Sequence, residues 1–138
     1  MFDHCLYFNT TALARVLERE WTRAFKPFGL TPSQAFMLRA VLGRPGLLQS
    51  ALATELAISR STATRTLDGL QKMKLLERRS TANDGRESAI EPTALALAMR
   101  EQLDAASGDV TKRLKKELGI AHFDETVAKV KSVRSAIG

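Results

Sequence analysis

Short hydroxyls and long cations recur along residues 59–72, and such side chains hydrogen-bond phosphates and the edges of bases. At helical spacing the polar residues share one face: Ser61, Thr64, Arg65, Asp68 and Lys72. The opposite face holds Ala63, Thr66, Leu67 and Leu70. Ser59 can cap this helix, because its hydroxyl can accept a hydrogen bond from a free backbone N–H one turn on. The pattern predicts an amphipathic helix with a polar face suited to an anionic partner.

A second short amphipathic helix is expected at residues 50–57, immediately before the first. Only Ile58 and Ser59 separate the two helices. So tight a turn between short helices predicts a helix-turn-helix, whose second helix enters the major groove of DNA. The alternative is a pair of packed helices in a small bundle.

Positive charge is concentrated around the same stretch. The 138 residues carry a formal net charge of +6, with a pI near 9.9. Residues 60–86 hold seven cations and three acids, a net of +4, whereas residues 1–59 have a net of +2 and residues 87–138 a net of 0. A local cluster of cations is expected where a protein binds phosphates.

After Met73 the pattern changes from helical to extended. Residues 75–80 and 87–91 are short candidate strands, and Asn83-Asp84-Gly85 between them is a turn signal. Leu47-Leu48 is a further candidate for a very short strand. A hairpin directly after a helix-turn-helix, with cations on one arm and at its tip, predicts a winged helix. An ordinary surface hairpin is the alternative.

Helices are expected on the N-terminal side of this module. Residues 5–26 contain neither proline nor glycine and predict one long helix. Thr31, Pro32 and Gln34 then match a capping box with proline at the first helical position, and Gly43-Arg44-Pro45-Gly46 ends that helix.

Helices are also expected on the C-terminal side. Thr93 is positioned to cap one helix, Ser107-Gly108 to break or bend it, and Gly119 to end it before a last helix. The terminal helices have apolar faces that need burial, and a symmetric homodimer would provide it. The fold class is therefore mainly α with a small β-hairpin wing.

Several classes of protein are disfavoured. No apolar run approaches the roughly 20 residues that span a bilayer, and the N-terminus lacks the pattern of a signal peptide. The single cysteine excludes an internal disulfide, and His4 and His122 are not at metal-ligand spacing, so we expect no metal, no cofactor and a reducing cytoplasm. No catalytic motif indicates an enzyme. The rival class is a helical protein-interaction adaptor without DNA specificity.

The order and spacing of these pieces resemble the MarR family of winged-helix transcription regulators. The resemblance covers nearly the whole chain and rests on Leu30-Thr31-Pro32-Ser33-Gln34, Leu52-Ala53, Ser59 to Arg65, Leu67-Asp68-Gly69-Leu70, Leu76-Glu77-Arg78-Arg79, Asp84-Gly85-Arg86 and Thr93. It implies one domain over residues 1–138, with a winged module at about 31–92 and dimerisation helices at about 1–26 and 93–138. The implied partners are double-stranded DNA with a pseudo-palindromic operator, a second copy of the chain, and a small-molecule effector that releases a repressor.

The resemblance also implies roles for particular residues. The recognition-helix positions that touch DNA correspond to Ser59, Ser61, Thr62, Thr64 and Arg65. Arg86 corresponds to the wing arginine that enters the minor groove, and Asp84 to the acid that holds the wing. A guanidinium suits a narrow, electronegative groove, and an aspartate two residues away can fix its rotamer. The alternative for Arg86 is a surface ion pair of little energetic weight.

Three positions depart from the family pattern. Lys74 stands where a glycine usually favours left-handed backbone, Leu48 replaces a Ser/Thr cap, and Ala96 takes a glycine position. We therefore expect local geometry to differ at both ends of the motif.

Two candidate sensing devices follow. Cys5 lies roughly where the peroxide-sensing branch of the family has its reactive cysteine, and its alternative is an inert, buried thiol. The other is an apolar ligand pocket between the dimerisation helices and the winged module. Its candidate lining residues, which are equally suited to an ordinary core, are Trp21, Phe25, Phe28 and Phe36.

Overall fold

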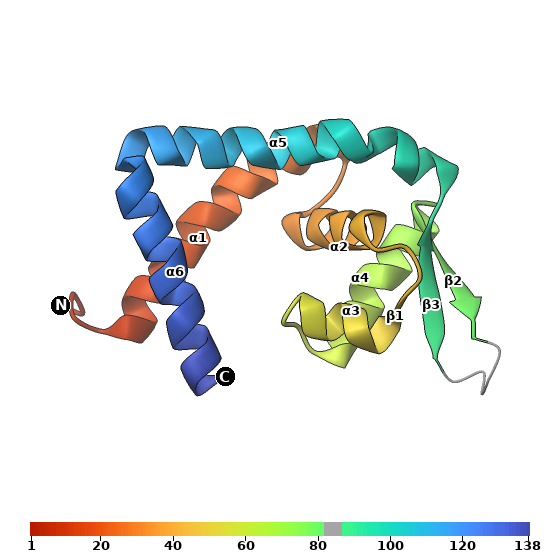
Figure 1. Cartoon of the computed structure of the whole chain (residues 1–138), viewed down its shortest axis with the longest axis horizontal. Coiled ribbons are helices and arrows are strands. Elements are labelled where there is room, and N and C mark those ends of the chain that lie inside the picture. The colour runs from red at the N-terminus through yellow and green to blue at the C-terminus, as the bar shows by residue number, and fades with distance from the viewer. Residues whose placement is uncertain (82–86) are drawn as a thin grey trace.

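The computed structural model describes residues 1–81 and 87–138. A long helix, α5 (Ala94–Leu118), runs across one end of the molecule (Figure 1). The N-terminal helix α1 (Leu6–Phe25) and the C-terminal helix α6 (Ile120–Ile137) lie on one side below it, where both termini are found. The remaining elements form a second lobe under the other half of α5.

This second lobe is the winged module. It contains the 3₁₀ turn Lys26–Phe28, the helices α2 (Pro32–Gly43), α3 (Gln49–Glu55) and α4 (Arg60–Lys72), and the strands β1 (Leu47–Leu48), β2 (Leu76–Ser80) and β3 (Ser88–Pro92). The strands form one antiparallel sheet in the order β1-β3-β2, with Leu47 opposite Ile90 and Arg78 also opposite Ile90 on the other side. The predicted fold class, mainly α with a small wing, is confirmed.

Helix starts follow the capping residues that the sequence predicts. The Thr31 hydroxyl accepts from the Gln34 backbone N–H at 3.2 Å. The side-chain oxygen of Gln34 accepts from the Thr31 backbone N–H at 3.0 Å, which completes the capping box. Ser59 caps α4 by accepting from the Thr62 backbone N–H. Leu48 precedes α3 without a side-chain cap, as its apolar side chain requires.

The core lies between α2, α4, the sheet and α5. Its largest fully buried side chains include Phe25, Met37, Leu67, Ile90 and Leu103. Ala63, Leu67 and Leu70 form the buried face of α4, spaced as expected for one side of a helix. This packing holds the opposite face of α4 toward solvent.

The expected break at Ser107-Gly108 is wrong, because α5 continues through both residues to Leu118. Ser107 is only 6% exposed, and its hydroxyl accepts hydrogen bonds from the Trp21 indole N–H and from Arg39, each at 3.0 Å. Arg39 also pairs with Asp104 at 2.8 Å. These contacts from α1 and α2 offset the roughly 1 kcal/mol that glycine costs inside a helix.

Among the described residues, left-handed backbone occurs at two non-glycine positions, Ala57 (φ 55°) and Lys74 (φ 63°). Each follows the end of a helix and completes a Schellman motif. After α4, the Lys74 N–H bonds the Gln71 carbonyl at 2.9 Å and the Leu75 N–H bonds the Leu70 carbonyl at 3.0 Å. Lys74 therefore adopts the conformation that favours glycine.

Large apolar side chains are exposed on α1 and α6. They include Leu6, Tyr7, Leu13, Val16, Val127, Val130, Val133 and Ile137. No residue of α6 is buried, although the helix is 18 residues long. None of the helices among the described residues has the length and apolar character needed to cross a bilayer.

We expect Lys74→Gly to raise the free energy of unfolding by about 1 kcal/mol, because glycine adopts left-handed backbone without steric strain. Urea unfolding followed by circular dichroism measures this. Lys74→Ala keeps the Cβ and is the matched control, expected to lie within about 0.5 kcal/mol of the wild type. Equal effects of the two substitutions would contradict the strain argument.

Ser107→Ala should lower the free energy of unfolding by about 1–3 kcal/mol, because the Trp21 indole N–H loses its acceptor in a partly buried site. Trp21 is the only tryptophan, so its fluorescence reports the local environment during the same titration. Ser132→Ala, on the exposed surface of α6, is the control and should have little effect.

Candidate nucleic-acid interface

The N-terminal half of α4 exposes the polar face that the sequence predicts. Ser59, Ser61, Thr64 and Arg65 are exposed, and Thr62 is half-buried. The hydroxyls at the start of the helix are connected, because Ser59 donates to the Thr62 hydroxyl at 2.9 Å and lies 3.2 Å from the Ser61 hydroxyl. The structure thus brings all five predicted recognition-helix residues onto one short segment.

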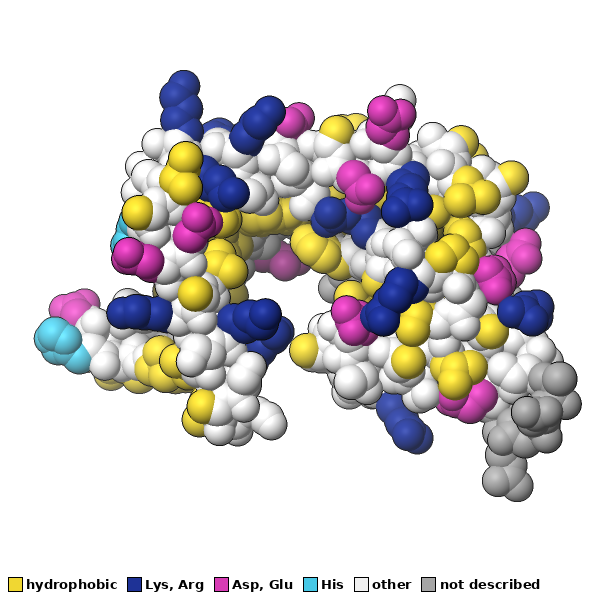
Figure 2. All heavy atoms as spheres, in the orientation of Figure 1, with side chains coloured by type: hydrophobic (Ala, Val, Ile, Leu, Met, Phe, Trp, Pro, Cys, Tyr) yellow, Lys and Arg dark blue, Asp and Glu magenta, His cyan; other side chains and the backbone are white. Residues whose placement is uncertain are grey.

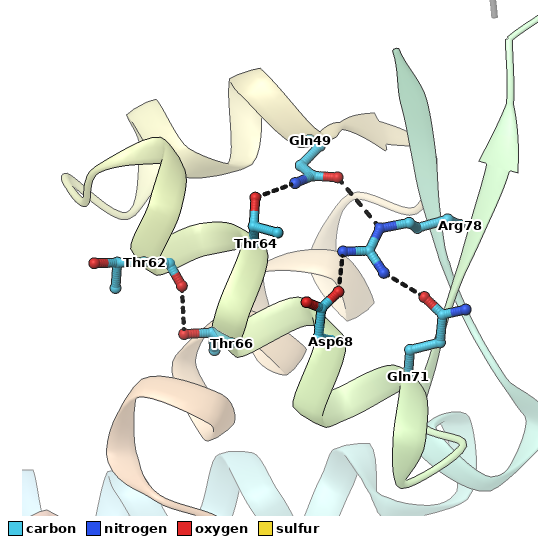
Figure 3. A network of polar contacts seen from close by, with 7 residues as sticks. All are labelled: Gln49, Thr62, Thr64, Thr66, Asp68, Gln71 and Arg78. Atoms are coloured by element: carbon cyan, nitrogen blue, oxygen red, sulfur yellow. Dashed lines mark hydrogen bonds and ion pairs between the residues drawn. The ribbon is translucent and has the colours of Figure 1, made fainter. Parts of the chain in front are cut away.

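Arg78 connects β2 to the two motif helices (Figure 3). Its guanidinium donates to Asp68 at 2.6 Å and to the Gln71 side-chain oxygen, both on α4. Its Nε donates to the Gln49 side-chain oxygen at 3.4 Å, at the start of α3. The Gln49 amide in turn donates to the Thr64 hydroxyl at 3.1 Å. One arginine therefore fixes β2 against both helices.

These contacts alter the interpretation of the charge cluster. Asp68 lies on the polar face of α4, as expected, but it pairs with Arg78. Arg79 pairs with Glu91 across the hairpin at 3.0 Å. Among the described residues, no ion pair involves Arg60, Arg65, Lys72 or Lys74. These four cations of the cluster lie on and just after α4.

A polar hollow of about 200 Å³ separates α4 from the base of the wing. Its lining residues include Gln49, Ser50, Arg60, Thr64 and Glu87. The Ser50 hydroxyl donates to the Glu87 carboxylate at 3.0 Å, which joins the start of α3 to the base of the wing. Arg86 was predicted to enter the minor groove, and Asp84 was predicted to support it. Both lie outside the described residues.

An apolar cavity of about 380 Å³ lies where α1 faces the winged module. Trp21 and Phe36 line it, together with Pro32, Ile58 and Thr62. In the space-filling view the molecule is hollowed between its two lobes (Figure 2).

The other two aromatic residues predicted to line a pocket lie elsewhere. Phe25 is fully buried in the core and contacts Phe36 edge to face, with ring centroids 6.0 Å apart. Phe28 packs against the same core. Neither lines this cavity, because both rings pack into or against the hydrophobic core instead.

Cys5 is exposed at the start of α1, where its sulfur accepts from the Phe8 backbone N–H at 3.5 Å. The residue thus has a structural role as the cap of α1. Within residues 1–81 and 87–138, no group of three or more His, Cys, Asp or Glu side chains is placed to hold a metal ion.

Two important residues of the interface were not found by sequence reasoning. Gln49 was not assigned a role, and Arg78 was counted as a cation and as part of the family resemblance, without a structural role. Both lie next to residues with recognised signals, yet their roles depend on partners 7 to 29 residues away in the chain. A hydrogen bond between segments so distant in sequence leaves no periodic pattern.

The geometry defines a winged helix-turn-helix protein. Residues 28–87 match the sequence model described as the MarR family. A putative transcriptional regulatory protein for the hcr operon of Thauera aromatica is 32% identical over 97 residues, which are 62% of this chain and 58% of that protein. The chain thus spans somewhat more than half the length of that relative. Over its winged module the chain is therefore similar to the MarR family.

Solved structures share the fold over almost the whole chain. A MepR–DNA complex from S. aureus has a TM-score of 0.87 at 18% identity, covering 98% of this chain and 100% of that one. The transcriptional regulator SlyA has a TM-score of 0.84 at 19% identity, covering 96% and 94%. A putative MarR family regulator from Listeria monocytogenes, complexed with a 26mer DNA, has a TM-score of 0.83 at 21% identity, covering 96% and 88%.

Proposed function

We propose that this chain is a sequence-specific DNA-binding transcriptional regulator that acts as a homodimer on a pseudo-palindromic operator. The observation that carries the proposal is the exposed start of α4, where hydroxyls and Arg65 stand on a helix held rigidly by its buried face. Side chains of these types make hydrogen bonds to phosphates and base edges. Two structural neighbours were solved in complex with DNA, which supports the same use of this fold.

Repression by occluding a promoter is the mode that we infer, by analogy with the family. A regulator of this kind works where chromosomal DNA lies, so the proposal includes a cytoplasmic location. The wing residues Asp84 and Arg86 keep the roles predicted for them from the resemblance.

The homodimer is supported by the exposed apolar faces of α1 and α6. Val127 and Val130 are each 52% exposed, and Ile137 is 81% exposed. Exposure of so many large apolar side chains on the two terminal helices is unfavourable in water and is expected where a partner covers the surface. A second copy of the chain would place two α4 helices on the same duplex, as a palindromic site requires.

Release by a small apolar or aromatic effector is the regulatory part of the proposal. The cavity beside Trp21 is bounded by α1 and by Ile58 and Thr62, at the start of the recognition helix. A ligand that contacts both walls would favour some positions of α4 relative to α1 over others. Such differential affinity is what a ligand needs to shift DNA binding.

The DNA-binding proposal is tested with Arg65→Ala. After selection of a preferred operator from random duplexes, we expect the substitution to weaken operator binding about 5- to 100-fold and random-duplex binding much less, because Arg65 is exposed on the polar face of α4. Fluorescence anisotropy at several salt concentrations measures both. Lys129→Ala on α6 removes the same charge away from α4 and is the control. Failure of the wild type to select any sequence would refute the proposal.

The homodimer is tested with Val130→Asp, which should shift the chain toward monomer because a carboxylate is costly to bury in an apolar interface. Analytical ultracentrifugation measures the change. Ser132→Asp introduces the same group on another face of α6 and should leave the sedimentation coefficient unchanged. A wild-type chain that sediments as a monomer would argue against this surface as a dimer interface.

A further inference from the structure

The orientation of the Gln49 amide is determined by its neighbour Arg78. A guanidinium has only hydrogen-bond donors. The Gln49 group 3.4 Å from Arg78 Nε must therefore be the carbonyl oxygen. This assigns the amide from chemistry, without relying on the distinction between its oxygen and nitrogen positions.

The same orientation determines the state of the Thr64 hydroxyl. The Gln49 NH₂ group lies 3.1 Å from Thr64 Oγ1, and an amide nitrogen can only donate. Thr64 therefore accepts at this contact, and its single hydroxyl proton must point elsewhere. Because Thr64 is exposed, that proton is accessible from the polar face of α4.

Thr66, two residues along, is different (Figure 3). Its hydroxyl donates to the Thr62 backbone carbonyl at 2.9 Å, within the helix. Thr11, Thr54 and Thr126 make the same bond one turn back in their own helices. Among the described residues, Thr64 makes no such bond to the backbone of α4.

We propose that Gln49 presets Thr64 as a hydrogen-bond donor to a base edge in the major groove. The contacted atom is then an acceptor: N7 or O6 of guanine, N7 of adenine or O4 of thymine. Cytosine exposes a donor at its N4 group in the major groove and is disfavoured on the contacted strand, because Gln49 already occupies one of the two lone pairs of the Thr64 hydroxyl. Thr64 is the specificity-determining residue and Gln49 the positioning residue, and the inference rests on the proposed DNA-binding function.

The arrangement is held in place before DNA arrives. Asp68 and Gln71 fix two donors of Arg78, whose side chain is only 25% exposed, and Arg78 fixes Gln49. A hydroxyl that already accepts one hydrogen bond loses fewer alternative orientations on binding DNA than a free hydroxyl does. This smaller loss of freedom favours discrimination between bases. In this proposal the Arg78–Asp68 pair acts through the Gln49 amide.

Gln49→Glu tests the polarity directly. A carboxylate accepts both from Arg78 and from the Thr64 hydroxyl, so the Thr64 proton turns inward and its lone pairs face the DNA. We expect the preferred base at the contacted position to change from an acceptor-bearing one to cytosine or another donor-bearing edge. The added negative charge weakens binding to every duplex. The measured quantity is therefore the ratio of the dissociation constants for the operator variants.

The contacted position is located on the operator selected by the wild type. For the wild type, cytosine there, or a 7-deaza purine where N7 is the acceptor, should weaken binding roughly 3- to 10-fold, as expected for one neutral hydrogen bond. Thr64→Val should remove this roughly 3- to 10-fold difference in affinity between operator variants, and Thr64→Ser, which keeps the hydroxyl, should retain it. Circular dichroism confirms that each variant is folded.

Three results would overturn the inference. Thr64→Val could weaken all operator variants equally, which would assign Thr64 to a phosphate. Gln49→Glu could leave the base preference of the wild type unchanged, which would show that the amide does not set the polarity. In both cases sequence-specific binding by the wild type survives, so the proposed function stands. A wild type that selects no sequence overturns both this inference and the proposed function.

Discussion

The geometry of the winged module depends on the hydrogen bonds of the Arg78 guanidinium. It donates to side chains of α3 and α4 from a strand that follows both helices in sequence. A guanidinium directs its donors in a fixed plane, so it constrains orientation as well as distance. The sheet, the first motif helix and the recognition helix are therefore held as one unit, and the wing that follows β2 starts from a fixed base.

That role of Arg78 also changes how the charge of the protein is understood. An excess of cations within residues 60–86 suggests a uniformly basic surface. In the folded chain two of these cations, Arg78 and Arg79, pair with acids. For the proposed DNA binding, contacts with phosphates are therefore expected from the remaining described cations of this stretch, which lie on and just after α4.

Ser107 is the corresponding junction between the terminal helices and the winged module. Its buried hydroxyl accepts from Trp21 on α1 and from Arg39 on α2. The apolar cavity lies beside the same tryptophan and extends to Thr62 at the start of α4. Displacement of α1 is thus connected through a few packed side chains to the helix proposed to read DNA, which is the physical basis for proposing regulation through this region.

The sequence by itself determined the features that depend on local interactions. Helix starts at Thr31, Ser59 and Thr93 follow from hydroxyls that bond backbone groups three residues away. The buried face of α4 follows from its spacing. The geometry at Lys74 was expected to differ because a lysine replaces the usual glycine, but the residue keeps the left-handed backbone that favours glycine. The order of helices and strands, and hence the resemblance to the MarR family, could be recognised from these signals.

Only the tertiary structure decided features that depend on distant partners. The sequence suggests a break at Ser107-Gly108, but contacts with Trp21 and Arg39 keep α5 continuous. Trp21 and Phe36 line the cavity while Phe25 is buried, because their directions depend on how α1 packs against the module. Gln49 acquires its role only when Arg78 and Thr64 meet it across three elements. Local hydrogen bonds are encoded within a few residues, whereas these contacts exist only after the chain has folded.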